Sequence, residues 1–454
     1  MCTGCQAQIS HVRPALTNDG EVLLYMEPLP PEARDFRFNI DAVAAMRNDG
    51  VDLPLDIHIA EIRGSESARQ RLLASAVLPP GEYRGISIKF HQAFQKTVSE
   101  EKALPVSDQP DKIAFPFTIK EKKGTVISLT LSLKEAMQEG AIFRPAYSAA
   151  IPNSPLTNLC GYVSNYGSNN VTVFDKREGT VRKVIETGQG PTGLALDQKN
   201  LRAYVAISGE DIIEVIDVLS NDIINTIRLT YGDHPGEIAL TSDGTTLLVV
   251  NPGNNSISFV DPLSLIVLSR LTVGNEPNSI LIDPTGKLAF VFNSISNNIN
   301  VVNIASRTIV ATITSEAGPL HGTFNRQGNE FLAIYEWSPN LVVFDLTTLA
   351  IQKRVYVGMG NYNIAVDTLT DLIYISKKFD PMVHIYDPFS LIQSDFLNAA
   401  GGAGYMLFDG DTRNMLLVIP DNKGLQAINL ISKKAEYLID VGEEPFRAAI
   451  MGER

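Results

Sequence analysis

Three side chains of complementary chemistry occupy one position of a repeated motif in the second part of the chain. Glu237, Ser279 and His321 each stand two residues after the landmark of their copy, and the three copies are consecutive. A carboxylate, a hydroxyl and an imidazole are the groups that acid–base or nucleophilic catalysis uses. However, no serine of the chain stands in a G-x-S-x-G nucleophile elbow. Catalysis is therefore the less favoured interpretation, and no catalytic residue is assigned.

The same position is mostly polar in all seven copies. If each copy contributes the inner strand of a ring, this position points into a central channel near one mouth. In ring order its occupants are Arg447, Gly193, Glu237, Ser279, His321, Asn363 and Tyr405. The residues that end the second strand of a copy are expected at the same mouth, and they include Asn165, Asn251, Asn293 and Lys377.

Two interpretations of this polar mouth stay open. Channels of this kind are polar and wet by construction, because loops and strand ends converge there around water. Alternatively, the mouth binds a ligand that is anionic or polyhydroxylated, with Tyr405 as an apolar wall. The candidate ligand-binding residues are then Arg447, Glu237, Ser279, His321, Asn363, Tyr405 and Lys377. Because Gly193 has no side chain, Arg447 and Glu237 on either side of it can reach each other.

Metal and cofactor chemistry has little support in the sequence. The chain has six histidines and three cysteines, and the only C-x-x-C, at Cys2 and Cys5, has no partner motif to complete a zinc site. The stretch DGDTRN at 409–414 resembles part of a calcium loop, but it lacks the terminal Glu and is predicted to be an ordinary turn. No metal site and no cofactor are predicted.

The landmark belongs to a repeat of about 42 residues. Pro277, Pro319, Asn361, Ala403 and Pro445 follow one another at intervals of 42, and Pro191 and Pro235 precede them in two earlier copies. Each copy contains four short β-branched runs separated by turn residues, such as NSILID, LAFVFN, INVVNI and IVATIT. Four antiparallel strands at this period are typical of a β-propeller blade.

The ends of the array indicate how the ring closes. The first copy, from about Gly161, has no inner strand before it, and the chain finishes with EEPFRAAIM, an inner strand with no blade after it. We therefore predict that residues 445–451 form the innermost strand of the first blade, which leaves no open edge.

The motifs CGYVSNYGSNNVTVFDKREGTVRKVIETGQGP and FVFNSISNNINVVN resemble the YVTN-type seven-bladed β-propeller repeat family. The resemblance covers about residues 158–451. It implies the fold but no single function, since such families include envelope proteins, binding modules and relatives of lactone hydrolases.

The region before the repeats has no such period. Runs such as VLPPGEYRGISIKF and FTIKEKKGTVISLTLSL predict strands, and SESARQRLLASA at 65–76 predicts one short helix. With FRPAYSAAI, these runs resemble a bacterial family of unknown function with a prealbumin-like β-sandwich, found in lipoproteins. We predict an all-β chain with a tether at 1–9, a β-sandwich domain at 10–148, a linker at 149–158 and a seven-bladed propeller at 159–454.

The N-terminal CTGC has two interpretations. A small residue and glycine before a cysteine resemble the end of a bacterial lipoprotein signal, which would make Cys5 the lipidated residue, although the apolar stretch that should precede it is absent. The alternative is an ordinary disordered N-terminus. The lipoprotein interpretation places the protein in the bacterial cell envelope, in the periplasm or at the outer membrane surface.

The composition of the chain argues against binding to nucleic acid and against a membrane-spanning segment. The net charge of -13 provides no basic surface for nucleic acid, and no apolar run of about 18 residues predicts a membrane span, so a membrane is expected only through a lipid anchor. The favoured function is a non-catalytic module that binds a protein partner or a small polar ligand at one propeller face. The alternative is a hydrolase or isomerase acting on a small lactone or sugar-like compound at the hub.

Overall fold

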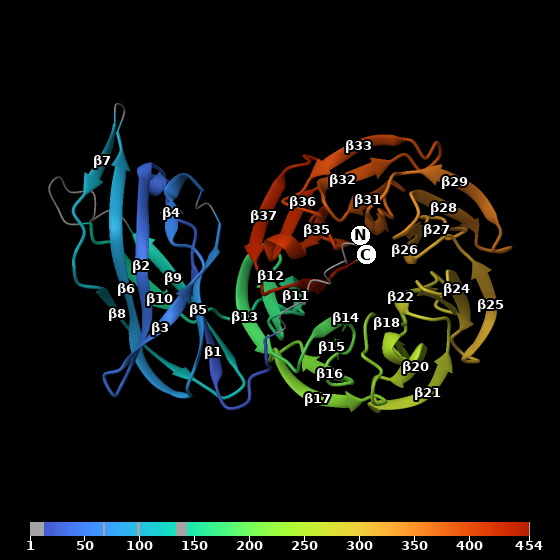
Figure 1. Ribbon diagram of the computed structural model, residues 1–454, viewed down its shortest axis with the longest axis horizontal. Coiled ribbons are helices and arrows are strands. Elements are labelled where there is room, and N and C mark those ends of the chain that lie inside the picture. Colours follow the sequence, from blue (N-terminus) through green and yellow to red (C-terminus); the bar gives the residue numbers. More distant parts are fainter. Residues whose placement is uncertain (1–12, 67–68, 98–99, 133–142, 454) are drawn as a thin grey trace, which may run out of the picture.

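The computed structural model describes residues 13–66, 69–97, 100–132 and 143–453, and these form an all-β N-terminal domain beside a seven-bladed β-propeller (Figure 1). Tether residues 1–9, including Cys5, lie outside the described residues. Short 3-10 helices occur at Pro31–Asp35, Gly64–Glu66, Thr157–Leu159, Pro252–Asn254 and Pro420–Asn422. Within the described ranges, no helix is both long and apolar enough to cross a membrane.

The N-terminal domain is built on one ten-stranded sheet with the order β10-β9-β1-β5-β3-β2-β6-β7, in which β4 pairs with β2 and β8 with β6. Its strands are β1 (Gly20–Met26), β2 (Phe36–Arg47), β3 (Asp52–Ile57), β4 (Glu61–Arg63), β5 (Arg71–Leu78), β6 (Gly81–Lys96), β7 (Glu101–Leu104), β8 (Asp111–Ile119), β9 (Gly124–Ser132) and β10 (Ala146–Ala150).

This sheet bends so that its two halves share one core. Leu24 on β1 and Ile127 on β9 belong to the same buried cluster as Phe38 on β2 and Ile88 on β6. The halves are joined through β3, which pairs with both β2 and β5. The domain is therefore all-β, as the sequence predicts. Its topology does not establish the predicted two-sheet sandwich.

The helix predicted at 65–76 was wrong. Residues from Arg71 onward form β5, which pairs antiparallel with β1. The run RLLASA contains good helix formers, but Leu73 and Ala74 are completely buried in the sheet. Tertiary pairing has overridden local helix propensity.

The first blade has the order β13-β12-β11-β38. Its strands are β11 (Cys160–Asn165), β12 (Asn170–Asp175), β13 (Thr180–Glu186) and β38 (Pro445–Ile450). Antiparallel pairing of β38 with β11 confirms the predicted ring closure by the C-terminal strand.

The other six blades are consecutive four-stranded meanders. The second and third contain β14 (Pro191–Asp197), β15 (Arg202–Ile207), β16 (Ile212–Asp217), β17 (Asp222–Arg228), β18 (Ile238–Leu240), β19 (Leu247–Asn251), β20 (Ser256–Asp261) and β21 (Ile266–Thr272). The fourth and fifth contain β22 (Pro277–Ile282), β23 (Leu288–Asn293), β24 (Asn298–Asn303), β25 (Thr308–Thr314), β26 (Pro319–Phe324), β27 (Glu330–Tyr335), β28 (Asn340–Asp345) and β29 (Ile351–Tyr356). The sixth and seventh contain β30 (Asn361–Val366), β31 (Ile373–Lys377), β32 (Asp380–Tyr386), β33 (Gln393–Asn398), β34 (Tyr405–Phe408), β35 (Asn414–Ile419), β36 (Gly424–Asn429) and β37 (Ala435–Asp440).

The Asp or Asn that ends the third strand of each repeat shapes the next turn. Asp387 Oδ1 accepts hydrogen bonds from the backbone N–H groups of Phe389, at 3.1 Å, and Ser390, at 2.8 Å. This is the Asx-turn arrangement, in which a side chain replaces a backbone acceptor. The same arrangement recurs at Asp175, Asp261, Asp345 and Asn429.

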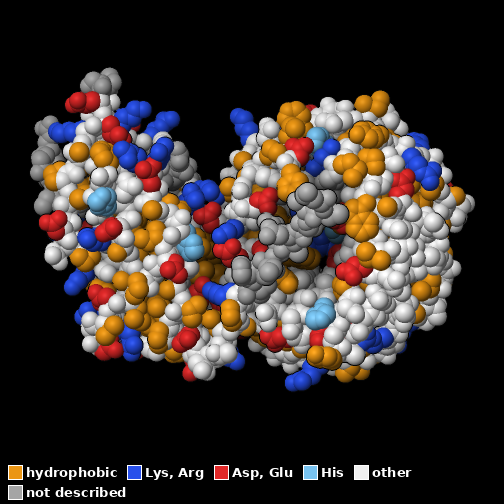
Figure 2. All heavy atoms as spheres, viewed as in Figure 1, with side chains coloured by type: hydrophobic (Ala, Val, Ile, Leu, Met, Phe, Trp, Pro, Cys, Tyr) orange, Lys and Arg blue, Asp and Glu red, His pale blue; other side chains and the backbone are white. Residues whose placement is uncertain are grey.

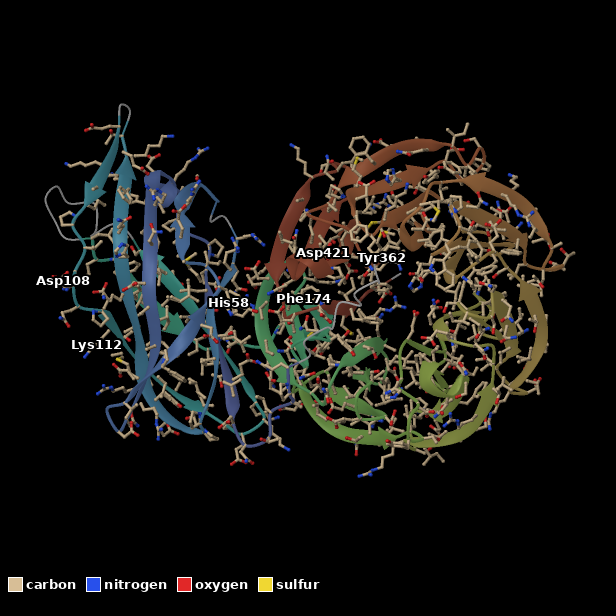
Figure 3. All side chains as sticks on the ribbon, in the orientation of Figure 1. His58, Asp108, Lys112, Phe174, Tyr362 and Asp421 are labelled. Atoms are coloured by element: carbon tan, nitrogen blue, oxygen red, sulfur yellow. The ribbon has the colours of Figure 1, made fainter. Side chains whose placement is uncertain are left out.

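The N-terminal domain packs against the first and seventh blades. Leu23 and Tyr25 of β1 share a buried cluster with Phe174 of β12 and Leu425 of β36. Arg71 Nε lies 2.8 Å from Asp440 Oδ2 across the junction. Figure 3 shows His58 and Phe174 on the two sides of this junction.

Candidate functional site

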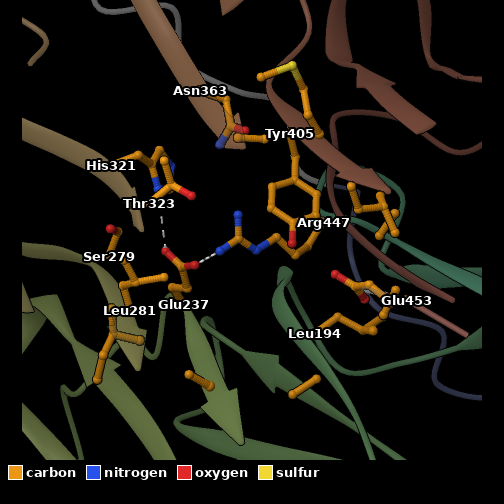
Figure 4. A pocket seen from close by; sticks show the side chains of 18 of the residues that line it. Leu194, Glu237, Ser279, Leu281, His321, Thr323, Asn363, Tyr405, Arg447 and Glu453 are labelled. Carbon is orange, nitrogen blue, oxygen red and sulfur yellow. Dashed lines mark ion pairs between the residues drawn. The ribbon is translucent and has the colours of Figure 1, made fainter. Parts of the chain in front are cut away.

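The inner strands of the blades enclose a cavity of about 410 Å³ at the centre of the propeller (Figure 4). We call the end where the inner strands begin the hub mouth, and the opposite end the far end. Figure 2 shows the propeller hollowed at its centre.

The structure brings together six of the seven candidate ligand-binding residues. The cavity is lined by Arg447, Glu237, Ser279, His321, Asn363 and Tyr405. Lys377 is the exception, because it ends β31 and pairs with Asn361, one strand farther from the channel axis. The equivalent Asn165 is also absent from the cavity wall; its Nδ2 donates to Asn170 Oδ1 at 2.8 Å within its own blade.

Arg447 and Glu237 form an ion pair across the gap at Gly193, as the sequence predicts (Figure 4). A Cβ atom on Gly193 would lie 2.5 Å from the carbonyl oxygen of Gly236, so the close approach of two inner strands requires glycine here. The Gly193 N–H donates to that oxygen at 3.0 Å. The glycine thus brings the second and third blades together and leaves space for the ion pair.

Arg447 makes a second contact inside the cavity. Its guanidinium carbon lies 3.9 Å from the ring centroid of Tyr405, a cation–π distance. On the other side of the ion pair, His321 Nδ1 lies 4.0 Å from Glu237 Oε2, beyond hydrogen-bond distance. The carboxylate and imidazole therefore face each other without a hydrogen bond.

Burial determines the protonation states in the cavity. It lowers the pKa of His321 to about 4, so this imidazole is neutral at pH 7. It also lowers the pKa of Arg447 to about 9, with the Glu453 carboxylate opposing the shift, so the guanidinium remains charged. Burial raises the pKa of the Tyr405 hydroxyl, which stays protonated.

Glu453 is a cavity residue that the sequence analysis missed. The segment after β38 crosses the far end: the Gly452 N–H donates to Gln198 Oε1 at 2.9 Å, and the Gly410 N–H donates to the Gly452 carbonyl at 2.9 Å. This crossing places Glu453 in the cavity wall. Burial raises the pKa of its carboxyl to about 7, and Arg447 opposes that shift. Glu453 lies beyond the last repeat landmark, so the repeat pattern gave no signal for it.

Several polar side chains in the cavity have no protein partner. Among the residues that the structure describes, none forms a hydrogen bond with the side chains of Ser279, His321, Asn363 or Tyr405. Ser279 is 2% exposed and Asn363 is 3% exposed. None of their polar atoms is among the completely buried, unpaired side-chain atoms of the described residues, so these atoms open onto the cavity, where water or a ligand can reach them. The hub therefore presents free donors and acceptors to whatever enters it.

Exposed apolar side chains surround part of the hub mouth. Trp337 and Phe379 lie in the loops after the second strands of blades five and six, and Tyr356 ends the fourth strand of blade five. Register places these segments at the end where the inner strands begin, since Pro319 pairs with Tyr335 and Asn340 with Tyr356. Trp337 is 49% exposed, Tyr356 76% and Phe379 86%. Figure 2 shows hydrophobic side chains gathered over these two blades. We call these three residues the aromatic arc.

A metal site has no geometric support in the described ranges, where no group of three or more His, Cys, Asp or Glu side chains is arranged to hold an ion.

Comparisons with known proteins support the fold alone. No family model matches the chain, and no curated protein does. Among solved structures, the dihydro-heme d1 dehydrogenase NirN in complex with DHE is 15% identical, with a TM-score of 0.54 over 67% of this chain and 78% of that one. The hydrazine synthase of Kuenenia stuttgartiensis is 18% identical, with a TM-score of 0.51 over 63% and 94%. A functionally unknown protein from Desulfotomaculum acetoxidans is 14% identical, with a TM-score of 0.57 over 64% and 98%. Two of these names are those of enzymes, so the similarity does not separate binding from catalysis.

Proposed function

We propose that the protein is a binding module that holds a small polar ligand in the hub cavity. One observation carries the proposal: the side chains of Ser279, His321 and Asn363, from three consecutive blades, converge on one cavity without hydrogen-bond partners among the described residues. A volume of about 410 Å³ falls within the range of ligand pockets, about 300–1,000 Å³. The Arg447–Glu237 pair and its contact with Tyr405 hold the wall in place before a ligand arrives.

Thermal-shift screening tests this function. A panel of small neutral, cationic and anionic metabolites is added to the full chain, and a rise in melting temperature is sought, because a ligand that binds only the folded state stabilises it. The double variant Ser279→Ala/Asn363→Ala should lose the shift. A matched variant, Ser220→Ala/Asn254→Ala, changes the same residue types outside the cavity and should retain it. Shifts that survive in the cavity variant would place the ligand elsewhere.

A protein partner is a second candidate, and the aromatic arc favours it. Exposed Trp, Tyr and Phe side chains gathered on one face are enriched at protein interfaces. The double variant Trp337→Ala/Phe379→Ala should reduce recovery of a bound protein at least tenfold in quantitative pull-downs from the native host. The control Leu263→Ala/Phe389→Ala alters exposed apolar residues in turns at the far end. Equal recovery with both variants would reject the arc as the interface.

The catalytic alternative, a hydrolase or isomerase acting on a lactone or sugar-like compound, stays a prediction. Hydrogen bonding between Glu237 and His321 would favour it, and their 4.0 Å separation does not supply that contact.

Family membership and cellular location are also proposals. The repeated YVSN and FVFN motifs support the YVTN-type assignment, and the prealbumin-like assignment of the N-terminal domain rests on its strand motifs. CTGC supports lipidation of Cys5 and a place in the bacterial cell envelope. Mass spectrometry of the native N-terminus tests the anchor: acyl chains on Cys5 are expected, and an unmodified Met1 would reject both the anchor and the location.

A further inference from the structure

The charges in the hub cavity are unbalanced. Among the described residues, its wall contains two carboxyl groups, Glu237 and Glu453, and one guanidinium, Arg447, but no lysine or aspartate. Arg447 is engaged on one edge by Glu237 and on one face by Tyr405. Within the described residues, the carboxylate at ion-pair distance from the Arg447 guanidinium is that of Glu237. Glu453 lies farther away. In the part of the chain that the structure describes, the ionisable cavity group without an oppositely charged partner is therefore the carboxyl of Glu453, which is a carboxylate above its pKa of about 7.

We infer that the hub selects a small organic cation that also carries hydroxyl groups, such as an amine-bearing polyol or amino sugar. The ammonium group lies against Glu453, and the hydroxyl groups exchange hydrogen bonds with Ser279, His321 and Asn363. This inference rests on the proposed binding function and specifies its ligand class. It replaces the anionic ligand that Arg447 suggests when the sequence is considered alone.

The electrostatic reason is simple. An anion entering the cavity meets a guanidinium whose charge Glu237 already neutralises, and it also meets the second carboxylate. A cation meets that carboxylate without having to break the existing pair. Because charges interact more strongly in a partly desolvated site than in water, this difference decides selectivity. The unpartnered side chains of Ser279 and Asn363 offer both donors and acceptors, which suits hydroxyl groups.

The selectivity should depend on pH through Glu453. The titratable groups that line the cavity with it are Arg447, Tyr405, Glu237 and His321. On the far side, the same C-terminal segment contacts the cluster of Lys176, Asp409 and Asp411. His321 is neutral at pH 7 and Arg447 is charged, so neither changes state between pH 6 and 8. The carboxyl of Glu453, with its pKa of about 7, does change state in this range.

Isothermal titration of the full chain with three matched linear polyols tests the inference. D-glucamine is a cation at pH 6–8, D-sorbitol is its neutral counterpart, and D-gluconate is its anionic counterpart. At pH 8 we expect glucamine to bind at least tenfold more tightly than sorbitol, and gluconate to bind more weakly than sorbitol. At pH 6 the preference for glucamine should fall several-fold, because the carboxyl of Glu453 is then protonated.

Glu453→Gln is the variant that isolates the carboxylate. The ratio of glucamine to sorbitol affinity should fall close to one at both pH values. Glu443→Gln is the control, because Glu443 is half exposed in a surface pair with Lys423 and should leave the ratio unchanged. The wild-type pH profile keeps the inference testable if the Gln variant does not fold.

The outcomes separate the inference from the proposed function. If gluconate binds most tightly, or if all three polyols bind equally, the cation preference is overturned while ligand binding at the hub stands. If no polyol binds and the metabolite panel also gives no shift that depends on Ser279 and Asn363, both are overturned.

Discussion

Two clusters of oppositely charged side chains tie the first blade to other blades, one at each end of the channel. At the far end, Lys176 Nζ contacts Asp409 Oδ1 at 2.7 Å, Asp411 Oδ2 at 2.8 Å and the Met451 carbonyl oxygen at 2.6 Å. At the hub mouth, Arg447 contacts Glu237 and the ring of Tyr405. Both clusters join residues from distant parts of the sequence, and both depend on the segment that follows Gly442.

The two clusters differ in how many of their hydrogen-bond donors have an acceptor. An ammonium group has three donors, and all three of Lys176 are used, with the side chain completely buried. A guanidinium has five donors, and Arg447 uses part of them while its neighbours Ser279 and Asn363 remain unpaired. A saturated cluster has no capacity for a ligand and serves structure. An unsaturated cluster on a cavity keeps its capacity for binding.

Removal of residues 443–454 should have the largest effect, because it takes away Arg447, one of the three acceptors of Lys176 and the inner strand of the first blade. We expect loss of cooperative unfolding and aggregation, since the strand edge of β11 becomes exposed. Calorimetry and light scattering measure these effects. Phe446→Ala, at a half-exposed side chain of the same strand, should melt like the wild type. A truncated chain that unfolds like the full one would show that closure is not required.

Lys176→Met should destabilise the protein by about 3–5 kcal/mol, because it removes the buried ammonium group that offsets the charge of the buried Asp409 carboxylate. Denaturant unfolding measures the change. Lys183→Met is the control: its pair with Asp222 is partly exposed, and about 0–1 kcal/mol is expected. A second substitution, Asp409→Asn, should recover part of the loss in the Lys176 variant. A cost below about 1 kcal/mol would mean that the far-end cluster is not structural.

Arg447→Ala should change ligand binding more than stability, which is the opposite of what we expect for Lys176→Met. The preference of the hub for glucamine over sorbitol should rise at least tenfold, about 1.4 kcal/mol, because Glu237 loses its counter-charge, while unfolding free energy falls by only about 1 kcal/mol because Glu237 borders the open cavity. Titration of a hub ligand and denaturant unfolding are measured on the same preparation. Lys176→Met, studied in conditions where it is folded, should retain the wild-type preference. If Arg447→Ala binds the hub ligand like the wild type, the cluster of Arg447 and Glu237 is structural, as the cluster at the far end is.

Glu453→Gln should produce the smallest change in stability, and its sign depends on pH. Burial raises the pKa of the folded-state carboxyl to about 7, above an unfolded value of about 4.3. The folded state therefore holds more protons in this window, so the contribution of Glu453 to stability is present at low pH and is lost as pH rises towards 7. The unfolding free energy of Glu453→Gln should not show this decline with pH. At pH 8 it should exceed that of the wild type by on the order of 1 kcal/mol.

Unfolding measured from pH 5 to 8 tests this, with Glu443→Gln as the surface control. A wild-type profile that matches that of Glu453→Gln would show that the carboxyl is not perturbed by its surroundings.

The sequence by itself determined the propeller, its closure and the polar ring at the hub mouth. Seven copies of a repeat near 42 residues fix the blade count, and the alternation of side chains along each inner strand decides which position faces the channel. That is why the spacing of the repeats alone was enough to group Arg447, Glu237, Ser279, His321, Asn363 and Tyr405. The Arg447–Glu237 contact followed from the absence of a side chain at Gly193.

Tertiary structure alone decided the features that depend on pairing between distant segments. Leu72 and Ala74 adopt a strand because they pair with Tyr25 and Leu24 of β1, although their local sequence favours a helix. Asp409 and Asp411 of the DGDTRN turn hold Lys176, which no local motif indicates. Lys377 ends outside the cavity because its strand lies one position farther from the axis. Glu453 enters the cavity because the segment after the closing strand folds across the far end, and that path is set by contacts with Gln198 and Gly410, which no repeat period encodes.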